Sequence, residues 1–464
     1  MTYLFLQSLL QGVTAAIVVV ILFGLAIFVH EFGHFLAAKW LGFQVNAFAI
    51  GFGPALWRKK YGQTEYRINA IPFGGYVALP QLDPAGMEQI QGDSGSDPKT
   101  LPDAPAWKRI VVSLAGPFGN VVLAVIIAWM IWLAPGAVTG VVSTEVGEVV
   151  KGTAAWEAGI RAGDVIEQVG PRRVTTWSDF MVECHLLAND ADQIDLTVRT
   201  PGSAARVVNV SVTNVVSGVR GVPGIYWLGK CQIGSVDPSM PAAAAGMASG
   251  DVISSFDGEP VRNSQDFVMR MRDAGERPVE LGVLRKGRPR SITVTPKLSG
   301  EGFTIIGVSV QDSADAAMWM QYRDPWRQIN NDATQVFRVL QAMVVPKVEG
   351  ERGRVAKSIG GPVIIIAYMW RIVQESFLSG MGFLRMICIN LAIINLLPLP
   401  VLDGGHIMFA LWEIITRRKP HPRVVSILVT GFAVLLIGLM TFLSFKDVRL
   451  LSSRFTQGKA AQTE

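Results

Sequence analysis

The chain is poor in cysteine and in charged residues. Only three of its 464 residues are cysteines, and 17% of the residues are charged, against about a quarter in an average soluble domain. Cys184, Cys231 and Cys388 are too few and too scattered for a disulfide framework, and they lack the close pairing of a cysteine-based zinc site. We interpret them as ordinary core or membrane residues.

The sequence also lacks the pattern of a nucleic-acid-binding protein. Its formal net charge is +5, but no basic face is interleaved with aromatic residues. The basic residues instead lie beside apolar runs, and the cluster between Arg417 and Arg423 is an example. Such flanks are typical of the cytoplasmic ends of membrane spans. We therefore expect a lipid bilayer, and no nucleic acid, as a partner.

Long apolar runs are what the sequence does contain, since half of its residues are hydrophobic. Four segments approach or exceed the roughly 20 residues that a hydrocarbon core requires. Basic residues gather between the first and second segments and between the third and fourth, so both loops should be cytoplasmic and both chain termini external. The predicted spans are residues 12–29, 110–134, 377–397 (interrupted by Arg385) and 424–443.

Residues 42–77 contain glycine-rich, alternating sequence that favours short strands and tight turns. Strands at membrane depth must be shielded by protein or by a water-filled cavity, because lipid cannot satisfy their backbone groups. We therefore expect a membrane-associated β segment here. A polar loop rich in proline, glycine and aspartate should follow it, up to residue 105.

A repeat lies between the second and third spans. Ala158–Ile166 recurs as Ala245–Ile253, with Gly159 and Gly246 87 residues apart. Each copy should form a short strand, a helix and a closing strand rich in β-branched residues. The copies resemble the permuted PDZ domains of bacterial proteases, which implies binding of extended peptides, including peptide C-termini, at a sheet edge. The alternative is that either copy is a spacer without a ligand.

Residues 326–347 have helical spacing of apolar residues with polar residues between them. This pattern predicts an amphipathic helix. The helix could lie at the membrane interface or pack on the repeats.

Residues His30 to His34 form an H-E-x-x-H motif at the end of the first apolar run. On a helix, His30 and His34 share a face and can hold one metal ion, while Glu31 can act as a general base beside it. The alternative is a pair of histidines that only pack or hydrogen-bond. Ionisable residues inside a span cost about 2.5–3.5 kcal/mol each, and a cation would compensate for them. We therefore predict a zinc site.

A catalytic zinc ion has three protein ligands and one open position. Asp403 is the best candidate for the third ligand, because it lies at the cytoplasmic end of the third span and so at the depth of the histidines. Pro398 and Pro400 should interrupt the helix around it. Asp403 could instead cap the next helix, and His406 is a rival ligand.

With these motifs assembled, the chain resembles the site-2 protease family of intramembrane zinc metalloproteases. Gly119 stands where alanine is common in that family, a departure to which we attach no functional weight. The further matching segments are Gly51–Pro54, Pro72–Val77, Ala115–Asn120, Ser358–Pro362 and Asn395–Gly404.

The resemblance implies zinc bound by His30, His34 and Asp403, with Glu31 as general base and acid. It implies single-pass membrane substrates already shortened by a first protease, such as anti-sigma factors, and signal-peptide remnants as further substrates. The PDZ-like copies would act as an external size filter, and the β segment would hold the substrate extended. The expected substrate-binding residues are Asn390, Asn395, Gly74 and Gly75.

The predicted fold is a polytopic α-helical membrane protein with four transmembrane helices, a membrane-associated β segment and two external α+β PDZ-like domains. The expected location is the bacterial cytoplasmic membrane, with the active site toward the cytoplasm. The expected domains are residues 1–41 (first transmembrane helix), 42–108 (cytoplasmic β segment and loop), 109–136 (second transmembrane helix), 137–225 and 226–312 (PDZ-like domains), 313–375 (amphipathic region), 376–412 (third transmembrane helix) and 413–464 (fourth transmembrane helix and tail).

Two other functions are compatible with parts of the sequence. One is an inert membrane-anchored PDZ scaffold, against which the intact Glu31 argues, because metal binding alone does not need it. The other is a metal transporter, but transporters usually contain two halves with paired, interrupted spans, and no such repeat is present.

Overall fold

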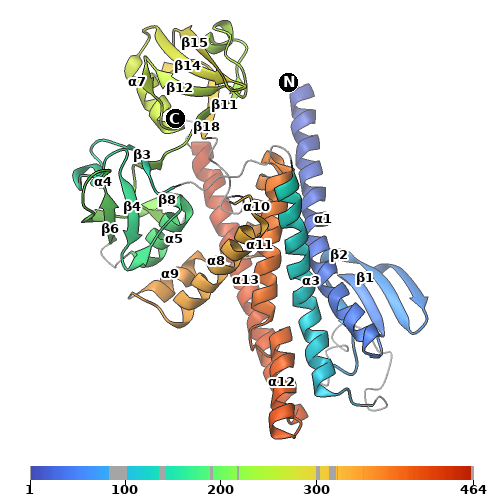
Figure 1. The fold of residues 1–464 in the computed structure, drawn as a ribbon. Coiled ribbons are helices and arrows are strands. Elements are labelled where there is room, and N and C mark those ends of the chain that lie inside the picture. Colours follow the sequence, from blue (N-terminus) through green and yellow to red (C-terminus); the bar gives the residue numbers. More distant parts are fainter. Residues whose placement is uncertain are drawn as a thin grey trace. The chain divides into compact units, whose positions relative to one another are not determined.

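The computed structural model describes residues 2–82, 102–134, 143–188, 192–216, 219–298, 304–312, 320, 322–348 and 350–460. Most of the polar loop expected up to residue 105 lies outside these described residues. The chain forms two compact units (Figure 1). The first comprises Met1–Ala137, Asp324–Phe337 and Gly360–Glu464, and the second comprises Val138–Arg323 and Arg338–Ile359.

The first unit contains the apolar helices. Within the described part of the chain, four helices are long and apolar enough to cross a membrane: Gly12–Trp40, Ala106–Leu133, Phe377–Asn395 and Pro422–Arg449. The four apolar segments of the sequence are therefore helices that qualify as candidate spans by length and composition. They belong to α1 (Thr2–Trp40), α3 (Ala106–Leu133), α11 (Phe377–Asn395) and α13 (Pro422–Ala460), and α10 (Pro362–Glu375) is a shorter apolar helix.

Helix α3 packs against α1, α11 and the short helix α12 (Asp403–Thr416). Glycines bring α1 and α3 into backbone contact. A methyl group on Gly33 would lie 2.2 Å from the carbonyl oxygen of Ala115, and one on Gly119 would lie 2.7 Å from that of Val29. Small residues permit such close helix crossings in membranes. The glycine at position 119 therefore has a steric reason that the sequence alone does not reveal.

The arginine inside α11 is buried and paired. Arg385 Nε donates to Asp332 Oδ2 at 2.7 Å, and a second guanidinium nitrogen donates to the side-chain oxygen of Gln328. Both partners belong to α8 (Pro325–Val344), and Gln328 also donates to the carbonyl of Ala128 in α3. The first half of the predicted amphipathic helix therefore packs on the apolar helices.

The second half of α8 belongs to the other unit. There Arg338 donates to the carboxylates of Glu183 and Glu351 at 2.6–2.7 Å. Ala342 is buried in the core of the first repeat. Packing on a repeat is one of the two alternatives expected for this helix, the other being a place at the membrane interface, and its second half does pack on the first repeat.

Strands β1 (Ala47–Tyr61) and β2 (Thr64–Ala78) form an antiparallel sheet beside α1 (Figure 1). Each long strand folds back on itself, because Ala49 pairs with both Arg67 and Tyr76. The resulting order of segments is 75–78, 47–50, 64–69 and 55–61. Segment 75–78 is the first in this order and is therefore an edge of the sheet. Gly51 has a φ of +85°, and a side chain there would meet the carbonyl of Ile71 at 2.5 Å.

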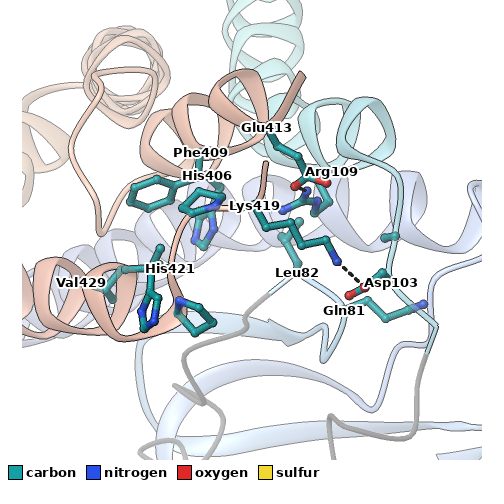
Figure 2. Close-up of a pocket in the computed structure, with 14 residues that line it drawn as sticks. Gln81, Leu82, Asp103, Arg109, His406, Phe409, Glu413, Lys419, His421 and Val429 are labelled. Atoms are coloured by element: carbon teal, nitrogen blue, oxygen red, sulfur yellow. Dashed lines mark hydrogen bonds and ion pairs between the residues drawn. The ribbon is translucent and has the colours of Figure 1, made fainter. Parts of the chain in front are cut away.

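A cavity of about 520 Å³ lies where the first turn of α3, helix α12 and the start of α13 meet (Figure 2). Residues that follow β2 complete its lining. Figure 2 shows the side chain of Lys419 pointing to Asp103 and that of Glu413 to Arg109, the two ion pairs at the cavity.

The first repeat of the second unit has a four-stranded sheet in the order β5-β4-β6-β7, and a separate pair of β10 with β3. Its core is formed by apolar residues of both sheets and of α5. Strand β10 spans the boundary expected between residues 225 and 226. The elements are β3 (Val146–Val149), α4 (Ala154–Glu157), β4 (Val165–Val169), β5 (Arg172–Arg173), α5 (Trp177–Leu187), β6 (Gln193–Arg199), β7 (Arg206–Ser211), β8 (Thr213–Val216), β9 (Val219–Gly221) and β10 (Ile225–Trp227).

The second repeat has the strand order β15-β14-β12-β11-β18, with β13 beside β12. The strand, helix and closing strand expected in each copy are present in both. The elements are β11 (Cys231–Val236), α6 (Pro241–Ala244), β12 (Val252–Phe256), β13 (Glu259–Pro260), α7 (Ser264–Ala274), β14 (Val279–Arg285), β15 (Arg288–Val294), β16 (Lys297–Leu298), β17 (Thr304–Ile305) and β18 (Val308–Asp312). Helix α9 (Glu351–Ser358) follows α8 and packs on the first repeat.

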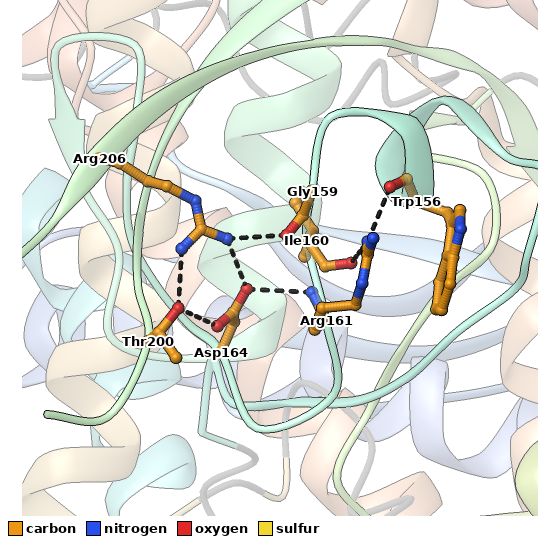
Figure 3. Close-up of polar contacts among 7 residues, drawn as sticks. All are labelled: Trp156, Gly159, Ile160, Arg161, Asp164, Thr200 and Arg206. Atoms are coloured by element: carbon orange, nitrogen blue, oxygen red, sulfur yellow. Dashed lines mark hydrogen bonds and ion pairs between the residues drawn. The ribbon is translucent and has the colours of Figure 1, made fainter. Parts of the chain in front are cut away.

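The Gly-Asp pair of each repeat closes a turn. Asp164 is buried and accepts hydrogen bonds from the backbone of Arg161 and from the side chains of Thr200 and Arg206 (Figure 3). Asp251 accepts from the backbone of Ala248 and from Arg285. The repeated aspartates therefore have a structural role in satisfying the turn.

Candidate metal centre

Helix α1 places His30 and His34 one turn apart on the same face. Their ring centroids lie 4.8 Å apart and their Nε2 atoms 3.3 Å apart. This follows from the four-residue spacing on a regular helix. The two imidazoles therefore converge on one point.

Asp403 comes to the same point from the first residue of α12. Its Oδ2 lies 3.4 Å from Nε2 of His30, and its Oδ1 lies 3.4 Å from Nε2 of His34. Leu402 is the N-cap of α12, and no side chain caps this end by a hydrogen bond. The capping alternative is therefore not what the structure contains. His406 lines the cavity of Figure 2.

The ligand atoms of His30, His34 and Asp403 all lie within 4.8 Å of one another. Among the described residues, this is the one group of histidine, cysteine or acidic side chains with such geometry. The three side chains are 14%, 10% and 16% exposed, so the site is shielded but reachable. Two imidazoles and one carboxylate form a donor set that suits zinc.

The outer nitrogen of each imidazole also has a partner. His34 Nδ1 lies 2.8 Å from the carbonyl oxygen of Val112, which can only accept, so Nδ1 carries the proton and Nε2 is left as a ligand. His30 Nδ1 lies 3.3 Å from the amide of Asn120. Asn120 is fully buried, and its Oδ1 has no hydrogen-bond partner as placed.

Rotating the Asn120 amide by half a turn gives its oxygen a hydrogen-bond partner. The rotation exchanges the positions of the amide oxygen and nitrogen and leaves the shape of the side chain unchanged. The rotated oxygen accepts from a protonated Nδ1 of His30, and Nε2 of His30 then faces Asp403 as a ligand atom. The residues present therefore fit a zinc ion. In the sequence, Asn120 is only the last residue of the Ala115–Asn120 motif, and a polar amide within an apolar helix is the signal that points to its role.

Gly116 makes room for the second histidine. A methyl group at this position of α3 would lie 2.2 Å from Nε2 of His34. Only glycine fits there without displacing the ring. The Ala115–Asn120 motif thus supplies both the space for one ligand and the partner of the other.

Glu31 lies between the histidines and the edge of the β sheet. The backbone N–H of Val77 donates to its carboxylate. A methyl group on Gly75 would lie 3.1 Å from Cγ of Glu31. A peptide that pairs with this edge as an added strand would therefore lie beside the Glu31 carboxylate.

The expected substrate-binding residues differ in their surroundings. Asn395 Nδ2 lies 3.5 Å from Nε2 of His30. Asn390 is half-buried on α11, and in the described part of the chain no hydrogen bond joins it to the metal ligands. Gly74 has a φ of +116°, and a side chain there would overlap the ring of Phe52. Gly74 and Gly75 thus have steric reasons for lacking a side chain.

Comparison with known proteins places these features in one family. The sequence model of peptidase family M50 matches residues 18–439. The Regulator of sigma-E protease RseP of Escherichia coli is 29% identical over 452 residues, which cover 92% of this chain and 97% of that protein. The Protease RseP of Yersinia pestis is 28% identical over 466 residues, which cover 95% and 99%.

Solved PDZ domains are structural neighbours of part of the chain. The PDZ domain of the SdrC-like protein from Listeria innocua is 20% identical and matches with a TM-score of 0.17. The match covers 18% of this chain and 92% of that structure.

Proposed function

The chain belongs to peptidase family M50, and from this premise we propose that His30, His34 and Asp403 hold the zinc ion of an intramembrane protease in which Glu31 is the general base. Family membership makes the protein a zinc metalloendopeptidase that carries out regulated intramembrane proteolysis. The observation that carries the assignment of residues is the convergence of three ligand atoms within 4.8 Å from α1 and α12.

The zinc ion, when bound, supplies Lewis acidity that activates a water molecule and polarises the scissile carbonyl. Glu31 takes the proton of that water and returns it to the leaving amine. His34 and His30 are held by Val112 and Asn120, so the ligand atoms are already oriented.

A peptide bond inside a helix must be unwound before it can be attacked, because its backbone is hydrogen-bonded within the helix. Residues 75–78 form an edge of the sheet, and backbone groups of this edge other than the Val77 N–H held by Glu31 can offer replacement hydrogen bonds by strand addition. Gly75 keeps this edge close to Glu31. Asn395, and Asn390 five residues earlier on α11, would hydrogen-bond the unwound backbone.

The substrates are single-pass membrane proteins that a first protease has shortened, with anti-sigma-factor-like proteins first among them and signal-peptide remnants as a further class. The name of the Escherichia coli relative, Regulator of sigma-E protease RseP, supports this choice. The two repeats would admit only trimmed substrates and would bind peptide C-termini at their sheet edges.

The protein lies in the bacterial cytoplasmic membrane, with the repeats outside and the metal centre toward the cytoplasm. The basic clusters beside the first and fourth apolar helices support this orientation. The β sheet lies at the membrane, next to the motif helix.

The test is cleavage of a truncated single-span substrate by purified protein in liposomes. We expect cleavage by the wild type and none by Glu31→Gln protein that retains its zinc. Undiminished cleavage by Glu31→Gln would remove the role of Glu31. A wild type that binds peptides but cleaves nothing would favour the inert scaffold instead.

A further inference from the structure

The cavity of Figure 2 begins about one helical turn from the metal centre. Helix α12 starts with Asp403 and then contributes His406, Phe409 and Glu413 to the cavity wall. At a rise of about 1.5 Å per residue, His406 lies about 4.5 Å further along the helix axis than Asp403, and Glu413 about 15 Å. The cavity therefore extends away from the metal ligands along the same helix.

The opposite wall continues the edge strand. Strand β2 passes Glu31 and ends at Ala78, and the chain then runs on to Gln81 and Leu82, which line the cavity. Gln81 is fixed there, since its Oε1 accepts from the backbone of Gln44 and its Nε2 donates to the carbonyl of Pro102. A peptide that adds to the edge beside Glu31 is thus directed toward this cavity.

The lining is apolar in part and ionic in part. Leu82, Phe409, Val425 and Val429 supply apolar surface, and two ion pairs, Lys419 with Asp103 and Arg109 with Glu413, complete the wall. The volume of about 520 Å³ is that of a typical small-ligand site, which spans roughly 300–1,000 Å³. It can hold a short peptide segment with a large apolar side chain.

One of the two ion pairs is exposed. The side chains of Lys419 and Asp103 are 53% and 83% exposed, and such pairs contribute only about 0–1 kcal/mol. A cationic side chain of a ligand can therefore replace Lys419 as the partner of Asp103 at little cost. The segments that flank a membrane span on the cytoplasmic side are enriched in lysine and arginine.

We propose that this cavity binds the cytoplasmic flank of the substrate, a short segment with one large apolar side chain followed by a basic residue. The inference rests on the proposed function and adds a second recognition site to it. The apolar side chain packs on Phe409 and Leu82, and the basic residue pairs with Asp103. The enzyme thereby recognises the substrate sequence beyond the cleaved region.

The experiment uses the full chain and two single-span substrates that differ only in this flank. One carries a large apolar residue and an arginine, and the other carries glycine and serine at the same positions. The readout is the ratio of kcat/KM between the two substrates. We expect a ratio of about ten for the wild type, which corresponds to the burial of one apolar side chain. Phe409→Ala and Asp103→Asn should each bring the ratio toward one.

Two exposed residues provide matched controls, Ile415→Ala on α12 and Asp273→Asn in the second repeat. Both should keep the ratio of the wild type. A ratio that survives in Phe409→Ala and Asp103→Asn, or a wild-type ratio of one, would overturn the proposal. Equal losses on both substrates would point to a structural or lipid-binding role of the cavity.

A binding measurement separates this proposal from the proposed function. A fluorescent peptide with the flank sequence is titrated onto Glu31→Gln protein, which needs no catalysis. We expect binding that Asp103→Asn weakens several-fold and that Asp273→Asn leaves unchanged. Binding without any cleavage by the wild type would count against the protease and not against the cavity, whereas cleavage without flank binding would count against the cavity alone.

Discussion

A methyl group on Gly116 would lie 2.2 Å from the Nε2 atom of His34. The backbone of α3 therefore fixes how far the second histidine can reach, because the ring fills the space that a side chain would need. The neighbouring Gly33, on the motif helix itself, approaches Ala115 equally closely. The metal centre thus depends on the contact between α1 and α3 as much as on its ligands.

The first prediction concerns this contact. Gly116→Ala should displace the His34 ring and lower zinc affinity by at least about tenfold, the scale seen when the surroundings of metal ligands are disturbed. The zinc content of the protein after dialysis against a chelator measures this loss of affinity. Gly24→Ala is the matched control in α1, since a methyl group there meets no atom within 4 Å. Equal zinc retention by the two variants would show that the contact is not needed.

The second prediction concerns Asn120, whose amide faces Nδ1 of His30. Asn120→Leu leaves that nitrogen without an acceptor, and zinc affinity should fall about 10–100-fold. Asn120→Asp keeps an acceptor and should retain more zinc than the leucine variant. If Asn120→Leu binds zinc like the wild type, the amide does not orient His30.

Much of this architecture can be predicted from the sequence. Apolar length predicts the four helices, and the spacing of His30 and His34 predicts their common face. The pairing with Asp403 depends on a shared depth in the membrane, which loop charges indicate. The repeated Gly-Asp pairs predict two similar domains.

Other features depend on contacts between elements that are distant in the sequence. Nothing local to Asn120 shows that it faces His30. In the sequence, Arg385 interrupts an apolar span. In the structure, it is buried and paired with Asp332, about fifty positions away. The steric roles of Gly116 and Gly119 depend on where α1 crosses α3, which periodicity alone does not give.

The third prediction concerns the buried pair of Arg385 and Asp332. Removal of one partner leaves a buried charge without compensation, which destabilises proteins by about 3–5 kcal/mol. Arg385→Met should therefore increase hydrogen exchange in the first half of α8, while the double variant Arg385→Met, Asp332→Leu should recover most of the protection. Equal exchange in the single and double variants would show that an unpaired Asp332 charge is not the cause of the lost protection.

The fourth prediction concerns pH and the second repeat. The hydrogen bond from Arg285 holds the pKa of Asp251 below its usual range. A lowered pKa stabilises the fold above the unfolded value of about 3.9, and this stabilisation is lost as the pH falls through the folded value. Arg285→Leu should therefore weaken protection of residues 246–256 at neutral pH and have a smaller effect as the pH falls below about 3.9.

Hydrogen exchange corrected for its intrinsic pH dependence measures that protection. Arg288→Leu is a suitable control, because Arg288 is exposed on the neighbouring strand β15. The same loss of protection at neutral and at acidic pH would mean that Arg285 acts by packing and not through the charge of Asp251.

The central claim is that His30, His34 and Asp403 together hold the catalytic zinc ion. The most direct measurement is the zinc content of purified wild-type and Asp403→Ala protein, determined beside cleavage of a single-span substrate. We predict one tightly held zinc ion per chain in the wild type, and loss of both zinc and cleavage in Asp403→Ala. An Asp403→Ala protein that keeps its zinc and still cleaves would contradict the claim.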